Sequence, residues 1–212
     1  MRQENRIEEV DVLRGIAAVL MILGHSFIVY PVDISGVWWC KALRHFIYTF
    51  HMELFFVLAG VVYRCRNYNT YISKKIKRIL VPYLFFGISA MLCRAFGGVL
   101  VNGVEPVGEG ISKLLFHGGG YWFLYVLFLL LAFYPFMEKI LNQTWKKAAF
   151  AVIMLVLSMV IELPRIFMLS TCIYYIPYFI FGDCMKQKIG GGGAKAQPDI
   201  CWDFGPDYVL CN

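Results

Sequence analysis

Six long apolar stretches constrain how this chain can fold more than any other feature of its sequence. They cover residues 13–30, 46–63, 79–96, 121–137, 148–163 and 166–182. Hydrophobic residues make up 59% of the 212 residues and charged residues only 16%, which is untypical of a soluble domain. A helix of about 20 apolar residues crosses the hydrocarbon core of a bilayer. The sequence therefore predicts an all-α, polytopic integral membrane bundle with about six transmembrane helices.

The connections between these stretches differ in their content of lysine and arginine. Fourteen of these residues lie at the N-terminus, in the second and fourth connections and in the C-terminal tail, and five lie on the alternate side, in the other connections or at the end of the third stretch. Cytoplasmic connections carry the excess of Lys and Arg in membrane proteins. We therefore expect both termini in the cytoplasm. The first stretch lacks the small-residue cleavage site of a signal peptide, so we expect it to be the first membrane helix.

The composition changes after the sixth stretch. Four consecutive glycines begin at Gly190, and a polar, irregular segment follows them to Asn212. Segments of this kind are typical of flexible linkers and disordered tails. The sequence thus predicts a transmembrane domain over residues 1–189 and a disordered, glycine-rich tail over residues 190–212.

Cysteine spacing and net charge exclude several other classes of protein. The seven cysteines show no CxxC pair, so the sequence supports neither a zinc site nor a disulfide framework, and no metal is expected. The net charge of +6 is explained by basic connections beside the membrane. We therefore expect membrane lipids, and no nucleic acid, among the partners of the chain.

Three ionisable side chains fall on one face of the first apolar stretch. Arg14 and His25 are separated by eleven residues, which is close to three helical turns, so they lie within about 20° of each other and about 16 Å apart along the axis. Asp11 lies about 40° from His25 on the same wheel. Ionisable residues inside a membrane span are functional candidates by default. The alternative is an Asp–Arg anchor at the interface together with a hydrogen-bonded core histidine. We expect His25 to lie deep in the span.

Ionisable groups also occur in and after the second stretch. His51 and Glu53 are two residues apart, so they cannot share one helical face, and one of them could line a pocket. Ala59 and Gly60 offer a small surface for close helix approach. The connection that follows contains a basic cluster of Lys74, Lys75, Lys77 and Arg78 directly before the third stretch. Such a cluster either anchors the chain on anionic lipid or binds a phosphorylated donor.

Four stretches of the sequence together resemble the acyltransferase-3 family of integral-membrane acyltransferases. These stretches are residues 11–17 (DVLRGIA) with His25, residues 50–60 (FHMELFFVLAG), residues 75–83 (KIKRILVPY) and residues 122–124 (WFL). The resemblance extends over about residues 6–188 and is greatest to members that acetylate sugars, including the fucose O-acetylase-like branch. The first stretch is the most specific of the four.

The chain departs from the family pattern in two respects. The basic motif usually contains two arginines three residues apart, whereas this chain has Lys75 and Arg78. Lysine keeps the charge but lacks the planar fork of arginine, which predicts weaker donor binding. Members generally have about ten spans against the six counted here, so the chain is expected to be a truncated form.

The resemblance implies transfer of an acyl group, usually acetyl, from cytoplasmic acyl-CoA to a hydroxyl of a glycan or lipid-linked sugar, in a bacterial plasma membrane. His25 would act as the general base or carry the acyl group itself, and both roles remain open. Arg14 would hold a donor phosphate or polarise the thioester carbonyl, and Asp11 would orient Arg14. Glu53 would complete the site. Lys74, Lys75, Lys77 and Arg78 would bind the donor headgroup.

Two other functions are compatible with the sequence. A small transporter or export component would use the ionisable face of the first stretch as a polar pathway. The absence of an inverted repeat in the sequence argues against this function. An inactive fragment of an acyltransferase would insert into the membrane without catalysing transfer.

Overall fold

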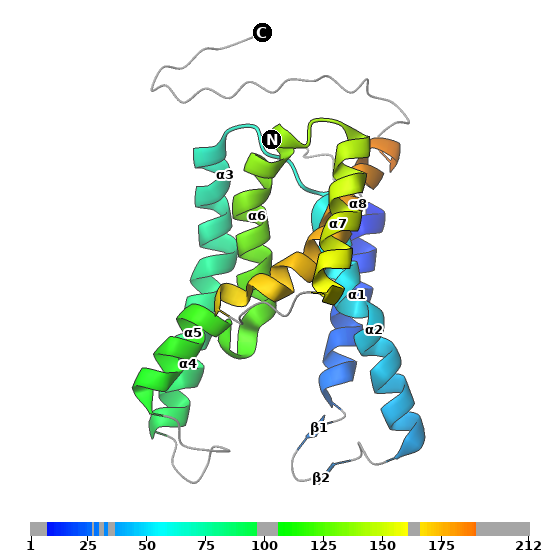
Figure 1. Cartoon of the computed structure of the whole chain (residues 1–212). Coiled ribbons are helices and arrows are strands. Elements are labelled where there is room, and N and C mark those ends of the chain that lie inside the picture. The colour runs from blue at the N-terminus through cyan, green and yellow to red at the C-terminus, as the bar shows by residue number, and fades with distance from the viewer. Residues whose placement is uncertain are drawn as a thin grey trace. The chain divides into compact units, whose positions relative to one another are not determined.

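The computed structural model describes residues 8–26, 28–29, 32–33, 37–96, 106–160 and 166–189. The elements in chain order are α1 (Glu8–Ser26), β1 (Ile28–Val29), β2 (Val32–Asp33), α2 (Trp38–Val61), α3 (Tyr68–Lys75), η1 (Ile76–Leu80), α4 (Val81–Phe96), α5 (Val107–His117), η3 (Gly119–Tyr121), α6 (Trp122–Ile140), α7 (Thr144–Val160), η4 (Ile166–Met168) and α8 (Leu169–Ile189) (Figure 1). The predicted helical fold class is confirmed for these ranges, apart from one short β-hairpin. The predicted tail, 190–212, lies outside them.

Two stretches of the described chain are long and apolar enough to cross a membrane. They are Tyr68–Phe96, with a mean hydropathy of 1.8, and Val107–Ile140, with a mean hydropathy of 1.7. Helix α1 has 19 residues but carries several charged groups in its first half. A bundle of six spans is therefore not established by the helices that the structure describes, and it stays a prediction.

The described helices form two compact units. The first contains α1, α2, α7 as far as Leu157 and α8 from Tyr174. The second contains α3 to α6 with η1 and η3, together with η4 and the start of α8. The predicted catalytic residues lie in the first unit, and the predicted donor-binding cluster of Lys74, Lys75, Lys77 and Arg78 lies in the second. Each unit is therefore described by itself.

In the first unit, glycines allow helices to pack closely. A Cβ at Gly24 of α1 would lie 3.0 Å from Cε2 of Tyr48 on α2, so this glycine brings the two helices together. A Cβ at Gly60 of α2 would overlap the backbone of α8 at Phe179, and a Cβ at Gly182 of α8 would overlap the backbone of α2. The predicted small-residue surface at Gly60 is thus confirmed, and its partner is α8.

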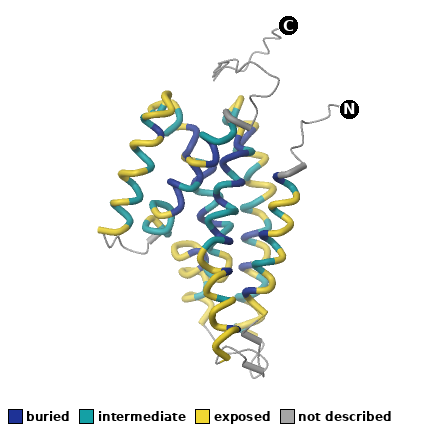
Figure 2. The backbone as a smooth tube through the Cα atoms, turned by 90° about the vertical axis from the view of Figure 1, so that its right-hand side faces the viewer, coloured by how far each residue is buried: buried dark blue, intermediate teal, exposed yellow. Residues whose placement is uncertain are grey.

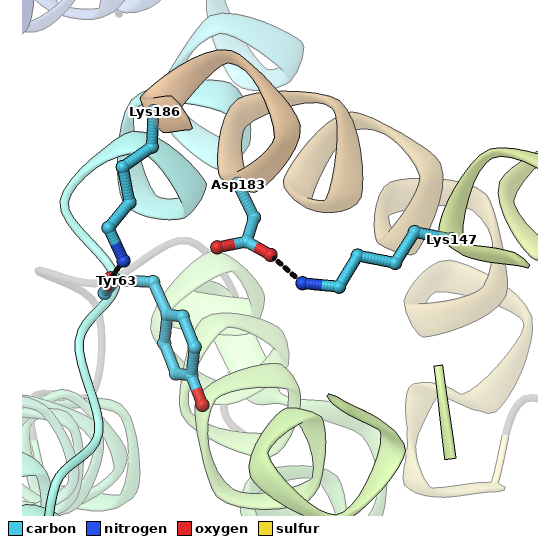
Figure 3. Close-up of polar contacts among 4 residues, drawn as sticks. All are labelled: Tyr63, Lys147, Asp183 and Lys186. Carbon is cyan, nitrogen blue, oxygen red and sulfur yellow. Dashed lines mark hydrogen bonds and ion pairs between the residues drawn. The ribbon is translucent and has the colours of Figure 1, made fainter. Parts of the chain in front are cut away.

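An ion pair lies between α7 and α8 inside the first unit. Nζ of Lys147 donates to Oδ2 of Asp183 at 2.5 Å, and both side chains are almost fully buried (Figure 3). One turn further along α8, Nζ of Lys186 donates to the carbonyl oxygen of Tyr63 at 2.6 Å. The fifth apolar stretch was predicted to begin at residue 148, which placed Lys147 in the fourth, basic connection. The structure instead places Lys147 within the first turn of α7.

The first predicted span ends earlier than its apolar sequence indicates. It was expected to continue to residue 30, but α1 ends at Ser26 and the chain enters an antiparallel hairpin that pairs Val29 with Val32. The β-branched residues Ile28, Val29 and Val32 favour extended backbone over helix. His25 consequently lies in the last turn of α1, and its expected depth in a membrane span stays a prediction. Figure 1 shows α1 and α2 side by side, with the hairpin strands between their lower ends.

In the second unit, α3, η1 and α4 follow one another without interruption. The segment η1 is a π-turn, in which the N–H of Val81 donates to the carbonyl of Ile76. Pro82 lacks an N–H and its ring conflicts with the carbonyl four residues before it, so the wider turn fits directly ahead of the proline. The basic cluster was predicted in a connection. The structure instead places it inside this helical stretch, from the end of α3 into η1.

The third connection, which precedes residue 121 and lies outside the six apolar stretches, contains α5 in its described part. Leu114 of α5 packs with Tyr83 of α4 and Tyr125 of α6 in a small core. The hydroxyl of Tyr83 donates to the carbonyl of Leu114 at 2.5 Å. Gly118 then ends α5 in the left-handed conformation, with φ of 71°. The apolar face of α5 therefore outweighed the low helix propensity of its glycines.

Large apolar side chains remain exposed on helices of both units. Ile22 is 64% exposed, Phe85 64% and Val152 63%. Figure 2 shows exposed residues alternating with buried and intermediate ones along the helices. An apolar surface of this kind is untypical of a soluble monomer and suits contact with lipid or with further helices.

Candidate active site

The predicted pair at the start of α1 is present. Nη1 of Arg14 lies 3.6 Å from Oδ1 of Asp11, one turn earlier on the helix. The side chains are 41% and 36% exposed. Asp11 therefore holds the guanidinium at the helix surface, where Arg14 keeps donors available for an anionic ligand.

His25 has one ring nitrogen fixed by the helix. Its Nδ1 lies 2.8 Å from the carbonyl oxygen of Met21. Because a carbonyl only accepts, Nδ1 carries the hydrogen of this bond, and Nε2 of the neutral ring keeps its lone pair. The side chain is exposed. A neutral imidazole with an accessible lone pair can accept a proton or attack a carbonyl carbon.

His51 repeats this arrangement in a buried position. Its Nδ1 lies 2.8 Å from the carbonyl oxygen of Ile47, and its side chain is fully buried. Nε2 of His51 has no hydrogen-bond partner among the described residues. A buried polar atom without a partner is costly and calls for an explanation. The sequence drew attention to His51 as an ionisable residue of the second stretch but did not select it as a site residue.

Tyr48 lies between the two histidines. Its ring centroid is 5.8 Å from that of His25 and 5.0 Å from that of His51. Cζ of Arg44 lies 5.6 Å from the same centroid. Arg44, Tyr48 and His51 follow the i, i+4, i+7 spacing of one helical face, which is the sequence signal that could have found this group. We call His25, Tyr48 and His51 the histidine face.

Glu53 belongs to a different side of α2. Its Oε1 accepts a hydrogen bond of 3.1 Å from the hydroxyl of Tyr174 on α8, and the hydroxyl of Tyr178 lies 3.5 Å from that of Tyr174. Oε2 of Glu53 is buried and has no partner within the described ranges. The prediction that His51 and Glu53 do not share a face is confirmed. The described hydrogen bond of Glu53 is made to α8, whereas Tyr48 and His51 lie on the side of α2 that contacts α1.

The basic cluster is exposed for the most part. Lys74, Lys77 and Arg78 are exposed, whereas Lys75 is intermediate and lies with Nζ 5.3 Å from the ring centroid of Tyr71. This cluster lies in the second unit and the histidine face in the first. The expected cooperation between them stays a prediction.

Comparison with known protein families identifies the chain. A family model described as an acyltransferase domain, acyltransferase-3, matches residues 7–188. The chain belongs to the acyltransferase-3 family. This match covers every site residue described above, and members of the family are membrane proteins. No curated protein and no solved structure matches the chain. The resemblance seen in the sequence is thereby confirmed, and it supports a transferase of acyl groups that acts at a membrane.

Proposed function

We propose that this chain transfers an acyl group, usually acetyl, from acyl-CoA to a hydroxyl of a glycan or lipid-linked sugar. The observation that carries this proposal is the geometry of His25. Its Nδ1 is fixed by the carbonyl of Met21, which leaves Nε2 as the acceptor of an exposed side chain, on the helical face that also carries Asp11 and Arg14. Membership in an acyltransferase family supplies the class of reaction.

In one route, Nε2 of His25 takes the proton of the acceptor hydroxyl while the oxygen attacks the thioester carbonyl. The carbon–sulfur bond then breaks, and the leaving thiolate takes the proton from the imidazolium to give CoA. In the other route, Nε2 attacks the thioester carbonyl itself, the carbon–sulfur bond breaks, CoA leaves as the thiolate, and Nε2 carries the acyl group. The acceptor hydroxyl then takes the acyl group and gives its proton to the released Nε2, from which the proton passes to the CoA thiolate.

Cationic groups on the cytoplasmic side would bind the donor. Arg14 lies about 16 Å from His25 along the axis of α1, so a donor headgroup near Arg14 can extend its thin arm toward the imidazole. Asp11 orients Arg14 for a phosphate or for the thioester carbonyl. Lys74, Lys75, Lys77 and Arg78 add positive charge for the phosphates of the headgroup, in the arrangement that we propose for the intact bundle.

The histidine face and Glu53 would support this chemistry. Tyr48 packs between the two imidazoles and fixes the approach of His25 to α2. Nε2 of His51 and Oε2 of Glu53 are buried acceptors without a partner among the described residues, and a substrate hydroxyl that enters the site would satisfy one of them. We place six spans in a bacterial plasma membrane, both termini in the cytoplasm, and the acceptor on the opposite side.

The proposal is tested with the full chain in membranes that lack other acyltransferases. Labelled acetyl-CoA is supplied, and both the release of CoA thiol and the label in a glycan fraction are measured. We expect both signals with the native chain and neither with His25→Ala, whereas His45→Ala, a matched exposed histidine of α2, retains both. Membranes that accumulate or export a labelled solute without thioester cleavage would indicate a transporter. Membranes that contain the inserted native chain but give neither signal would indicate an inactive form.

A further inference from the structure

The helical stretch from α3 through η1 to α4 keeps one side against α6. Near its start, the hydroxyl of Tyr68 donates to the carbonyl of Ala132 on α6 at 3.4 Å, and Tyr71, one turn later, is buried. Further along, the ring of buried Tyr83 lies with its centroid 5.6 Å from that of Tyr125 on α6. Figure 1 shows α3 beside α6. Tyr71 and Tyr83 therefore mark the side of the stretch that faces α6.

This side is continuous only because of the π-turn in η1. Tyr71 and Tyr83 are twelve residues apart, which is about three and a third turns of an α-helix and would place them about 120° apart. The hydrogen bond in η1 spans five residues instead of four, so the turn takes up one extra residue. The remaining eleven residues make about three turns, which brings the two tyrosines within about 20° of each other. Packing on α6 therefore favours the π-turn.

The π-turn also changes which cations of the basic cluster share a face. With one extra residue per turn, each residue inside it rotates by about 80° instead of about 100°. Lys74 and Arg78 then lie within about 20° of each other. Lys75 and Arg78 are about 120° apart, whereas an uninterrupted α-helix would place them about 60° apart. The exposure of the side chains agrees, because Lys74 and Arg78 are exposed while Lys75 is intermediate and lies over the ring of Tyr71, on the side of α6.

The surroundings of Lys74 and Arg78 suit an anionic ligand. Neither side chain has an ion-pair partner among the described residues. Glu138 of α6 interacts electrostatically with Tyr71, so the acidic charge lies on the side of Lys75. Lys74 and Arg78 are about 6 Å apart along the helix axis, which their long side chains can close around one phosphate group. Arginine supplies a bidentate fork for a phosphate, and lysine supplies a point charge.

We propose that Lys74 and Arg78, which the π-turn holds on one face, together bind a phosphate group of the CoA donor, and that Lys75 contributes only its long-range charge. We call Lys74 and Arg78 the phosphate pair. The basic motif of the family has its two cations three residues apart, at the positions of Lys75 and Arg78, so the structure assigns a different partner to Arg78. This inference rests on the proposed function for the identity of the donor, but the binding itself requires no acyl transfer.

The test measures equilibrium binding of labelled CoA to the full chain in neutral lipid discs. Lys74→Gln and Lys75→Gln remove the same charge from neighbouring positions. We expect Lys74→Gln and Arg78→Gln each to raise Kd by at least about tenfold, and Lys75→Gln to raise it by less than about threefold. Lys139→Gln, at the exposed end of α6, is the control for net charge. Equal weakening by Lys74→Gln and Lys75→Gln is the result for an uninterrupted helix and would overturn the proposal, as would failure of the native chain to bind CoA.

Double variants test whether the two cations hold the same group. Lys74→Gln with Arg78→Gln should raise Kd by clearly less than the product of the two single effects, because both residues lose one shared contact. Lys75→Gln with Arg78→Gln should raise it by about that product. Lys74→Arg keeps a cation at the position and should keep tight binding. Coupling of Arg78 to Lys75 instead of Lys74 would contradict the assignment. Thermal unfolding of each variant shows whether the fold is retained.

Two further arms distinguish the source of the phosphate. Pantetheine lacks phosphates, and we expect it to bind the native chain and Lys74→Gln alike. If CoA also binds both alike in neutral discs, while a preference of the native chain for discs that contain phosphatidylglycerol is lost in Lys74→Gln, the phosphate pair binds lipid headgroups and the donor assignment is wrong. Acyl transfer with CoA binding that is independent of Lys74 would overturn this inference and leave the proposed function intact. Binding that depends on Lys74 in a chain without transfer activity would do the reverse.

Discussion

Two carboxylate–cation pairs in the first unit have opposite environments. Lys147 and Asp183 are 2.5 Å apart and almost fully buried between α7 and α8, whereas Asp11 and Arg14 are 3.6 Å apart and more than a third exposed on α1. A buried pair is costly to break because the remaining charge loses its partner away from water. An exposed pair contributes little to stability. The buried ion pair therefore contributes to the fold, whereas the exposed ion pair can still contact a ligand.

The largest effect is expected at the buried pair. Replacing Lys147 with Met leaves the Asp183 carboxylate in a buried site without its ion-pair partner, and we expect a loss of about 3–5 kcal/mol of unfolding free energy. Unfolding of the full chain in micelles measures this loss. The matched control is Lys146→Met, the preceding residue on α7, which should cost much less.

A double variant sharpens the same comparison. Lys147→Met combined with Asp183→Leu removes both charges together, and it should recover most of the stability lost in the single variant. If Lys146→Met and Lys147→Met destabilise the chain equally, the buried pair does not have the structural role assigned to it.

An intermediate effect is expected at His51, which is buried as Lys147 is but has an acceptor without a partner. His51→Leu exchanges that acceptor for an apolar group, so the free energy of unfolding should change by no more than about 1 kcal/mol. Acyl transfer should nevertheless fall by about tenfold or more if Nε2 of His51 contacts the substrate. Thermal unfolding and the acetyl-transfer rate are measured on the same preparation. Loss of stability with normal transfer would make His51 a core residue.

The smallest effect on stability is expected at the exposed pair. Asp11→Asn keeps the shape of the side chain and removes its charge, so the free energy of unfolding should change by less than about 0.5 kcal/mol. The KM for acetyl-CoA should rise several-fold because Arg14 loses its orienting partner. Glu109→Gln, at an exposed carboxylate in the first turn of α5, serves as a matched control. A large loss of stability in Asp11→Asn would erase the contrast between the two pairs.

The helical period made part of the site predictable. Asp11, Arg14 and His25 were placed on one face from spacing alone, and the structure confirms the contact between Asp11 and Arg14. The end of α1 was not predictable in this way, because Ile28 and Val29 continue the apolar run whether they are helical or extended. The position of His25 at a helix end therefore emerged only from the structure.

Other parts of the fold and site depend on contacts between distant residues. Helix α5 was not predicted because its glycines favour a loop locally, although Gly87 and Gly110 allow it to pack on α4. Tyr48 was not singled out from the second apolar stretch. Its place between two histidines depends on how α1 meets α2, and hydropathy carries no information about that contact.

The central claim is that two residues of α1 have different roles: His25 takes part in the acyl-transfer step, and Arg14 binds the donor. It is tested most directly by measuring kcat and the KM for acetyl-CoA in His25→Ala and Arg14→Ala, with membrane insertion checked in both. We expect His25→Ala to lower kcat by about a hundredfold or more with little change in KM, because the general base or nucleophile is lost. Arg14→Ala should mainly raise KM. Full transfer activity in His25→Ala would contradict the account.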